Sequence, residues 1–223
     1  MAADDAARVS TRGQPSLATH QKNAPNATAR PHNRGLWWVV MATAGLAAVL
    51  VELPAQEWSG LLLSRELSAS PAVAGTGPLV AVAGVLVGRL FLDRTVDMIG
   101  WRAVARLGGA LTAAGTLVAL WLGAATREPA FLLIGLGVAA VGAGTAAPLL
   151  FDRAGHLAAH VGLSPNAGPG LVSGVFRLGV LASPLLVGGI ADSAGLFLAL
   201  GVTVLAGVTL TALADPLTRD RPH

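Results

Sequence analysis

Residues 88–102, GRLFLDRTVDMIGWR, gather ionisable side chains in a chain that is otherwise mostly apolar. A carboxylate at Asp93 can accept hydrogen bonds from the N-terminus of a neighbouring helix, where the helix dipole favours an anion. Gly88 has no side chain, so it lets another helix approach closely. Such a contact can be made and broken, which suits a gate. The alternative interpretation is a cytoplasmic turn at Gly100 whose cations only orient the protein. The charged residues of this segment are Arg89, Asp93, Arg94, Asp97 and Arg102.

Three further ionisable residues lie inside apolar stretches, where a charge is costly unless it reaches water or a partner. Glu52 lies well inside the first stretch. Either it faces a cavity and binds solute or protons, or it lies at the membrane interface. Glu57, nearer the outer end, is expected at the interface. Arg177 has two interpretations: it snorkels to the cytoplasmic side, or it faces a cavity and binds an anionic group or an acid.

Other kinds of site are disfavoured. The chain has no cysteine, which excludes disulfides and thiolate chemistry. HLAAH, residues 156–160, lacks the glutamate and third ligand of a zinc protease, so we expect a solvated loop there and no metal. GLGVAAVGAG, residues 135–144, lies in an uncharged segment without a preceding strand, and helix packing explains its glycines better than nucleotide binding. No nucleophile triad, phosphate loop or nucleic-acid patch is present. We therefore expect no enzyme activity, no cofactor and no nucleic-acid partner.

The composition predicts a membrane protein. Of 223 residues, 53% are hydrophobic and 12% charged, against roughly 25% charged in soluble domains, and the mean hydropathy is +0.65. Charges and prolines divide the chain into six apolar segments near the roughly 20 residues that a helix needs to cross a bilayer. The predicted fold is all-α, a polytopic membrane domain over residues 35–214. Its segments are 35–63, 71–92, 103–125, 129–151, 168–191 and 194–214.

The ends of the chain differ from this domain. Residues 1–34 are polar and aperiodic, which predicts a disordered tail, and residues 215–223 are expected to form a short C-terminal tail. Twelve of the lysines and arginines fall on the side of both tails, two lie in the connections on the other side, and Arg177 lies inside a span. Positive residues prefer the cytoplasmic side, so both tails should face the cytoplasm and the protein should be multi-pass in the plasma membrane.

The charged segment resembles the signature loop of the major facilitator superfamily, G-R-L-x-x-D-R-x-x-D-x-x-G, which follows the second helix of each six-helix half. VELPAQEWSGLLL, residues 51–63, resembles a seventh-helix pattern, E-G-x-x-x-D-W-S-x-x-Y-L, of a bacterial subgroup related to fucose permease and other sugar permeases. The later segments resemble the remaining helices of the same carboxyl-terminal half, in the same order. The resemblance covers about residues 36–214.

The resemblance implies roles for particular residues. The gating loop would comprise Gly88, Arg89, Asp93, Arg94, Asp97 and Gly100, and the candidates for a solute or proton cavity are Glu52, Glu57, Trp58, Ser59 and Arg177. There are departures from the pattern. Glu57 replaces the usual Asp, Leu62 stands where Tyr is common, and Pro54 frees a backbone carbonyl, as in the broken helices that line transport cavities.

The function that this resemblance implies is secondary transport of a small, sugar-like solute by alternating access, driven by protons through Glu52. Transporters of this family have two such halves, with the solute between them. The sequence therefore leaves two interpretations. In one, the chain is a half-transporter that pairs with a second six-helix half, as a parallel homodimer or with a separate chain. In the other, which is favoured, it is part of a longer protein. The alternative is a membrane protein that does not transport and acts as a regulatory partner or relic.

Overall fold

The computed structural model describes residues 34–160 and 162–218, which form seven helices. Of the tail predicted over residues 1–34, only Arg34 is among the described residues, where it begins the first helix; residues 1–33 and 219–223 lie outside them. In order, the helices are α1 (Arg34–Glu66), α2 (Pro71–Leu90), α3 (Leu92–Ile99), α4 (Trp101–Thr126), α5 (Pro129–His160), α6 (Ala167–Ala194) and α7 (Leu196–Thr218).

All of these helices except α3 are long and apolar enough to cross a membrane, so the predicted six-helix, all-α membrane fold is confirmed. The helices extend beyond several of the predicted segments. Residues 156–160, expected as a solvated loop, continue α5, and residues 215–218, expected as a tail, end α7. The prediction of a loop and a tail there was wrong because a charged residue ends an apolar run without ending a helix, which continues readily in water.

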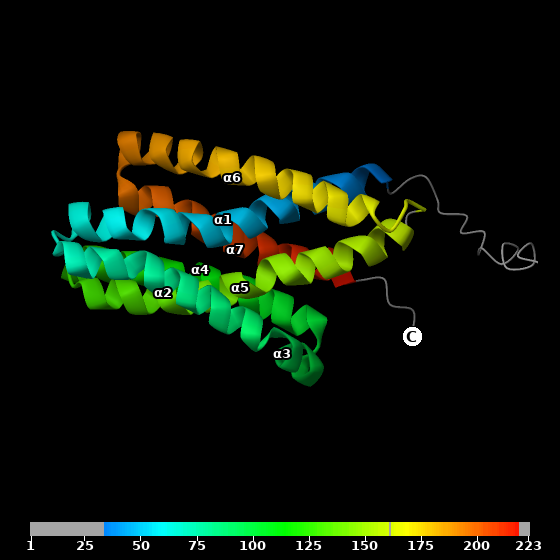
Figure 1. The fold of residues 1–223 in the computed structure, drawn as a ribbon, viewed down its shortest axis with the longest axis horizontal. Helices are drawn as coiled ribbons and strands as arrows, with labels where there is room; N and C mark the ends of the chain where they lie inside the picture. The colour runs from blue at the N-terminus through cyan, green and yellow to red at the C-terminus, as the bar shows by residue number, and fades with distance from the viewer. Residues whose placement is uncertain (1–33, 161, 219–223) are drawn as a thin grey trace, which may run out of the picture.

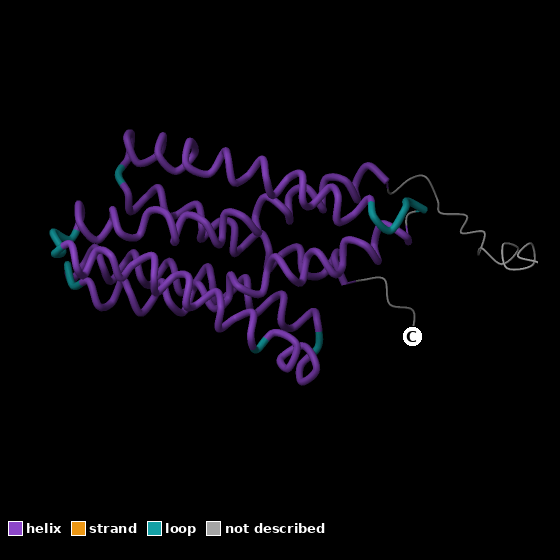
Figure 2. The backbone as a smooth tube through the Cα atoms, viewed as in Figure 1, coloured by secondary structure: helices purple, strands orange, loops and turns teal. Residues whose placement is uncertain are grey.

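The six long helices run side by side along the long axis of the molecule (Figure 1). The beginning of α1 and the end of α7 lie at the same end, as an even number of spans requires. We call this end the inner end and the opposite one the outer end. The connections between described helices are short. Those on either side of α3 lie along the lower edge of the view, and the others lie at the two ends (Figure 2). At the outer end, Ser70 accepts a hydrogen bond from the Val73 amide at 3.4 Å, and Pro71 takes the first helical position, where its missing N–H costs nothing.

Glycines bring neighbouring helices into backbone contact, most of all among α2, α4, α5 and α7. A Cβ on Gly115 of α4 would lie 2.9 Å from the Ala139 amide of α5, and one on Gly207 of α7 would lie 2.8 Å from the Ala113 amide of α4. A Cβ on Gly84 of α2 would lie 2.7 Å from the Gly137 carbonyl of α5. In a membrane, where lipid is as apolar as leucine, close packing of small residues is what associates helices. Helices α2, α5, α4 and α7 therefore form a tightly packed block.

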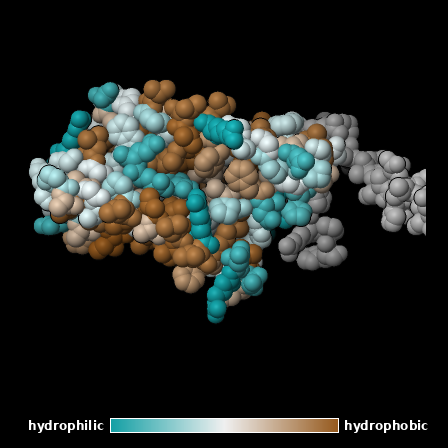
Figure 3. Space-filling view, in the orientation of Figure 1, coloured by the Kyte–Doolittle hydropathy of each residue, from teal (hydrophilic) through white to brown (hydrophobic). Residues whose placement is uncertain are grey.

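Helix α6 lies at the edge of the bundle, beside α1 (Figure 1). Its outward side carries large apolar side chains that no other described helix covers, among them Leu178, Leu181 and Leu185. On the face shown in Figure 3, apolar side chains predominate, but hydrophilic ones gather in the middle of the face over α6, α1 and α2. This face is therefore more polar at its centre than a surface that contacts only lipid would be.

Candidate functional site

The site lies where α1 and α2 diverge. In the outer half they pack directly: a Cβ on Gly77 of α2 would lie 2.8 Å from the Ser59 hydroxyl of α1. In the inner half α2 packs on α5 instead, and a Cβ on Gly88 would overlap the carbonyl oxygen of Val141. Helix α5 thus lies behind a widening gap between α1 and α2.

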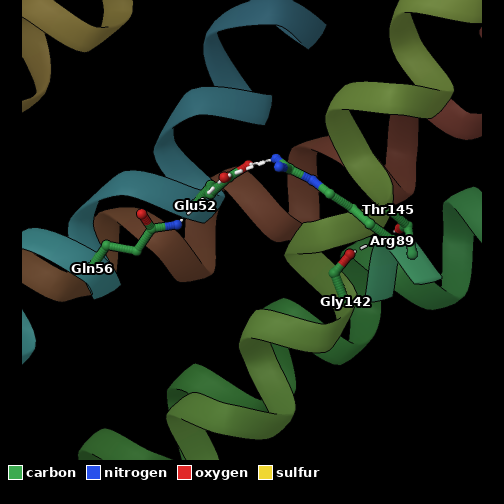
Figure 4. Close-up of polar contacts among 5 residues, drawn as sticks. All are labelled: Glu52, Gln56, Arg89, Gly142 and Thr145. Carbon is green, nitrogen blue, oxygen red and sulfur yellow. Dashed lines mark hydrogen bonds and ion pairs between the residues drawn. The ribbon is translucent and has the colours of Figure 1, made fainter. Parts of the chain in front are cut away.

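One ion pair bridges this gap (Figure 4). The Nη2 atom of Arg89, near the end of α2, lies 2.9 Å from both carboxylate oxygens of Glu52 on α1. One turn further along α1, the amide of Gln56 donates to the same carboxylate at 3.4 Å. The Glu52 side chain is 12% exposed and the Arg89 side chain 42%. The carboxylate is thus held inside the protein, while the guanidinium lies at its open surface.

The direction of the Arg89 side chain is unusual for a basic residue near the inner end of a spanning helix. Because α1 and α2 are antiparallel and Ser59 meets Gly77, Arg89, twelve residues beyond Gly77, is level with Ala47, twelve before Ser59. Glu52 lies five residues further toward the outer end, about 7 Å along the helix. Arginines near a membrane boundary usually extend toward water, whereas Arg89 extends deeper to reach the carboxylate.

Arg177 on α6 lies at the same level. Helices α1 and α6 run parallel, and a Cβ on Gly45 would lie 3.3 Å from Val175 while one on Gly179 would lie 3.1 Å from Val49. This register places Arg177 level with Ala47, and therefore with Arg89. Its side chain is exposed and has no hydrogen bond or ion pair with any described residue.

The other cavity candidates on α1 do not gather around Glu52. Glu57 is exposed. Trp58 packs on α6, where its ring lies 3.4 Å from the position of a Cβ on Gly188, and Ser59 is buried against α2. The Trp58 indole N–H and the Ser59 hydroxyl are buried without a hydrogen-bond partner among the described residues. Only Glu52 of this set faces Arg89.

The predicted gating loop is largely helical. After Gly88 and Arg89, residues Asp93, Arg94 and Asp97 belong to the short helix α3, and Gly100, with φ of 81°, separates α3 from α4. Asp93 lies in the first turn of its own helix, and no described residue donates a hydrogen bond to it. A groove of about 340 Å³ runs between α3 and α5, lined by Leu92, Asp93, Val96, Asp97, Trp101, Pro148, Leu149 and Asp152.

Two contacts at the inner end were not predicted. Asp215, near the end of α7, accepts hydrogen bonds from Arg102 at 2.6 Å and from Arg106, both on α4. Arg153 of α5 donates to the Leu217 carbonyl at 3.3 Å, and its guanidinium lies 5.3 Å from the centre of the Trp101 ring. The sequence signal for the contact of Asp215 with the two arginines was a single acidic residue at the end of a long apolar segment. Among the described residues, no three histidine or acidic side chains are placed to hold a metal ion.

Comparisons with known proteins give similarity over most of the chain. It is 28% identical, over 91% of its length, to a protein of Yersinia pestis named as an uncharacterized MFS-type transporter, of which it covers 53%. It is 31% identical, over 74% of its length, to the membrane protein MosC of Rhizobium meliloti, of which it covers 39%. The chain thus spans about half or less of the length of these relatives. No protein-family model and no solved structure matches it.

The similarity to the Yersinia pestis protein supports membership of the major facilitator superfamily (MFS). Both similarities agree with the six apolar spans, and together they support a multi-pass membrane protein of transporter type. In a chain with six apolar spans, a charged pair that turns toward the interior of the membrane is a candidate functional site, because intramembrane charges mark solute and ion pathways.

Proposed function

We propose that the chain acts in secondary transport of a small solute across the plasma membrane, by alternating access. The observation that carries the proposal is the ion pair between Glu52 and Arg89, which holds a poorly exposed carboxylate in the middle of a spanning helix. A pair that only stabilised the fold would be replaced at little cost by packed apolar side chains. Its position, where α1 and α2 diverge, suits a contact that changes when the helices move.

A proton accompanies the solute in this proposal, and Glu52 carries it. Arg89 is the charged partner that faces Glu52 from α2, and Arg177 is the charged residue of α6 at nearby depth. Helix α5 has no ionisable residue before Asp152, and α7 has none before Asp215. Since Glu57 on α1 itself is exposed, Glu52 is the carboxylate whose protonation would release Arg89.

The test is uptake by sealed vesicles that contain the chain, incubated with a metabolite extract and analysed by mass spectrometry. We expect at least one solute to accumulate under an inward proton gradient, and the Glu52→Gln variant to lose its response to the gradient. Asp192→Asn, at the outer end of α6, is the matched control and should behave as the wild type. Equal lumenal contents in vesicles with and without the chain would contradict transport by this chain alone or as a homodimer. That result would leave transport with a separate second half, or the alternative, a membrane protein that partners another and moves no solute.

A second six-helix half completes the transport path in this proposal, supplied by a second copy or by a separate chain. The hydrophilic centre of the face over α6, α1 and α2 supports such a partner (Figure 3). Leu86 on α2 and Leu181 on α6 are 53% and 72% exposed, and the helix registers place them at nearly the same level. Because the chain has no cysteine, one copy carrying Leu86→Cys and one carrying Leu181→Cys should form a disulfide in a homodimer. Failure to cross-link, with labelling of both cysteines, would favour a separate chain.

A further inference from the structure

The guanidinium of Arg89 has hydrogen-bonding capacity that the protein does not use. Glu52 is bound through Nη2 alone, and no described residue accepts a hydrogen bond from Nε or Nη1. Arginine carries five N–H donors in a fixed plane, so several remain for a second acceptor. Since the side chain is 42% exposed, an incoming group can reach them from the open side.

The charges around this position do not cancel. At the level of Ala47 the face carries Arg89 and Arg177, while Glu52 is the carboxylate bound to Arg89. The next acid on α1, Glu57, lies five residues further toward the outer end, and neither α5 nor α7 has an ionisable side chain at this depth. One positive charge is left over in an apolar setting, where an unpaired charge is costly.

We propose that the transported solute is a small organic monoanion whose carboxylate binds the unused donors of Arg89, with Arg177 supplying the second positive charge. This rests on the proposed transport function and specifies its substrate class. A carboxylate is planar and accepts two parallel hydrogen bonds from a guanidinium. One negative charge balances the excess, whereas a neutral sugar leaves it and a cation adds to it. The expected solute is therefore an acid, including a sugar acid, rather than a neutral sugar.

Glu52 and the solute carboxylate bind the same arginine at different donors, so their two negative charges lie close together and repel. Glu52→Gln keeps an oxygen and the shape of the side chain but removes this neighbouring negative charge, so the carboxylate should bind more tightly. Arg89→Lys keeps the positive charge that pairs with Glu52 but removes the planar fork, so the carboxylate should bind more weakly. A merely structural ion pair would lose stability in both variants and would not change ligand affinity in opposite directions.

The experiment measures thermal unfolding of the purified full chain in nanodiscs of phosphatidylcholine, a lipid without net charge. The probes are lactate and glucuronate, and their neutral counterparts are lactamide, with an amide in place of the carboxylate, and glucose, with a hydroxymethyl group there. We expect saturable stabilisation by at least one acid and none by its neutral counterpart. Arg89→Lys should weaken binding by about tenfold, as loss of a bidentate contact does, and Glu52→Gln should strengthen it. Arg177→Gln should weaken it less than Arg89→Lys, while Arg65→Lys, at the outer end of α1, should leave it unchanged.

Several results would overturn the proposal. Stabilisation by neither acid would do so, as would equal stabilisation by glucose and glucuronate or weaker acid binding in Glu52→Gln. Stabilisation by added phosphatidylglycerol alone, lost in Arg89→Lys, would assign the arginine to a lipid phosphate instead. Failure of the proposed function can be told apart from failure of this proposal. Acid binding without uptake into vesicles would contradict transport but support the ligand class. Uptake of a neutral solute would support transport but contradict the ligand class.

Discussion

At the scale of single residues, two arginines at the same depth in the bundle differ in whether they have a partner. Arg89 is bound to Glu52, whereas Arg177 has no partner among the described residues. Sequence alone identifies both as charges in or near apolar spans, and it identifies Glu52 as a candidate for a cavity. It does not pair Arg89 with Glu52, because they are 37 residues apart and the pairing depends on how α1 and α2 diverge.

The first prediction concerns the stability of this pair. Arg89→Ala should lower the free energy of unfolding by about 1–2 kcal/mol, because it leaves the poorly exposed Glu52 carboxylate unpaired. In the Glu52→Gln background, the same change should cost clearly less. A double-mutant cycle of unfolding in detergent measures the difference. Purely additive effects would mean that the two side chains do not interact.

At the scale of elements, glycines determine which helices approach. The glycine positions are visible in the sequence, and the prediction that they pack helices follows from composition. Which helix each one meets is not visible: Gly88 meets α5, since α5 lies behind the gap between α1 and α2. Helix α3 also escaped the sequence analysis, because its eight residues are too few and too charged to show as an apolar span.

The second prediction tests the contact between α2 and α5. Gly88→Val should destabilise the protein by about 1–3 kcal/mol, as overpacking does, because its side chain would meet the Val141 backbone. Gly75 lies in the same helix, with nothing within 4 Å of its Cβ position. Gly75→Val therefore also replaces a glycine by valine in α2, but without a steric clash. Thermal unfolding of the two variants separates packing from helix propensity. Equal losses would show that α2 and α5 are not in close contact at Gly88.

The third prediction concerns the inner end, where α4 and α7 are joined by charge. Asp215→Asn should weaken the contacts with Arg102 and Arg106. Since both arginine side chains are about half exposed, the loss of stability should be small and should shrink in high salt. Unfolding of the variant at low and high ionic strength checks both parts. A loss that is independent of salt would point to a packing role for Asp215 instead.

At the scale of the whole molecule, hydropathy was sufficient for the number of spans and their order. The twelve-to-two distribution of positive residues predicts that both described ends of the bundle face the cytoplasm. The candidate site was only partly predictable. Its charged members could be named, but the face on which they meet depends on helix registers that no sequence pattern encodes.

The fourth prediction tests this orientation, using the absence of native cysteine. Glu128→Cys, in the outer connection between α4 and α5, should react with a membrane-impermeant maleimide added to intact spheroplasts. Ser164→Cys, in the connection between α5 and α6, should react only after the membrane is permeabilised. The reverse pattern would invert the orientation and place the gap between α1 and α2 toward the outside.

The glycine contacts also imply how the chain should respond to a pulling force. Helices α2, α4, α5 and α7 touch at backbone level. Helix α6 meets backbone closely at Gly168, in its first turn, where it contacts Ala154 of α5, and beyond that it meets α1 through the side chains of Val175, Val49 and Trp58. Under tension applied at the C-terminal end, the well-packed α7 should resist, and once it yields, α6 should follow with little further force. The protein is thus mechanically unequal on its two sides, and the ion pair of Glu52 with Arg89 lies along the line between them.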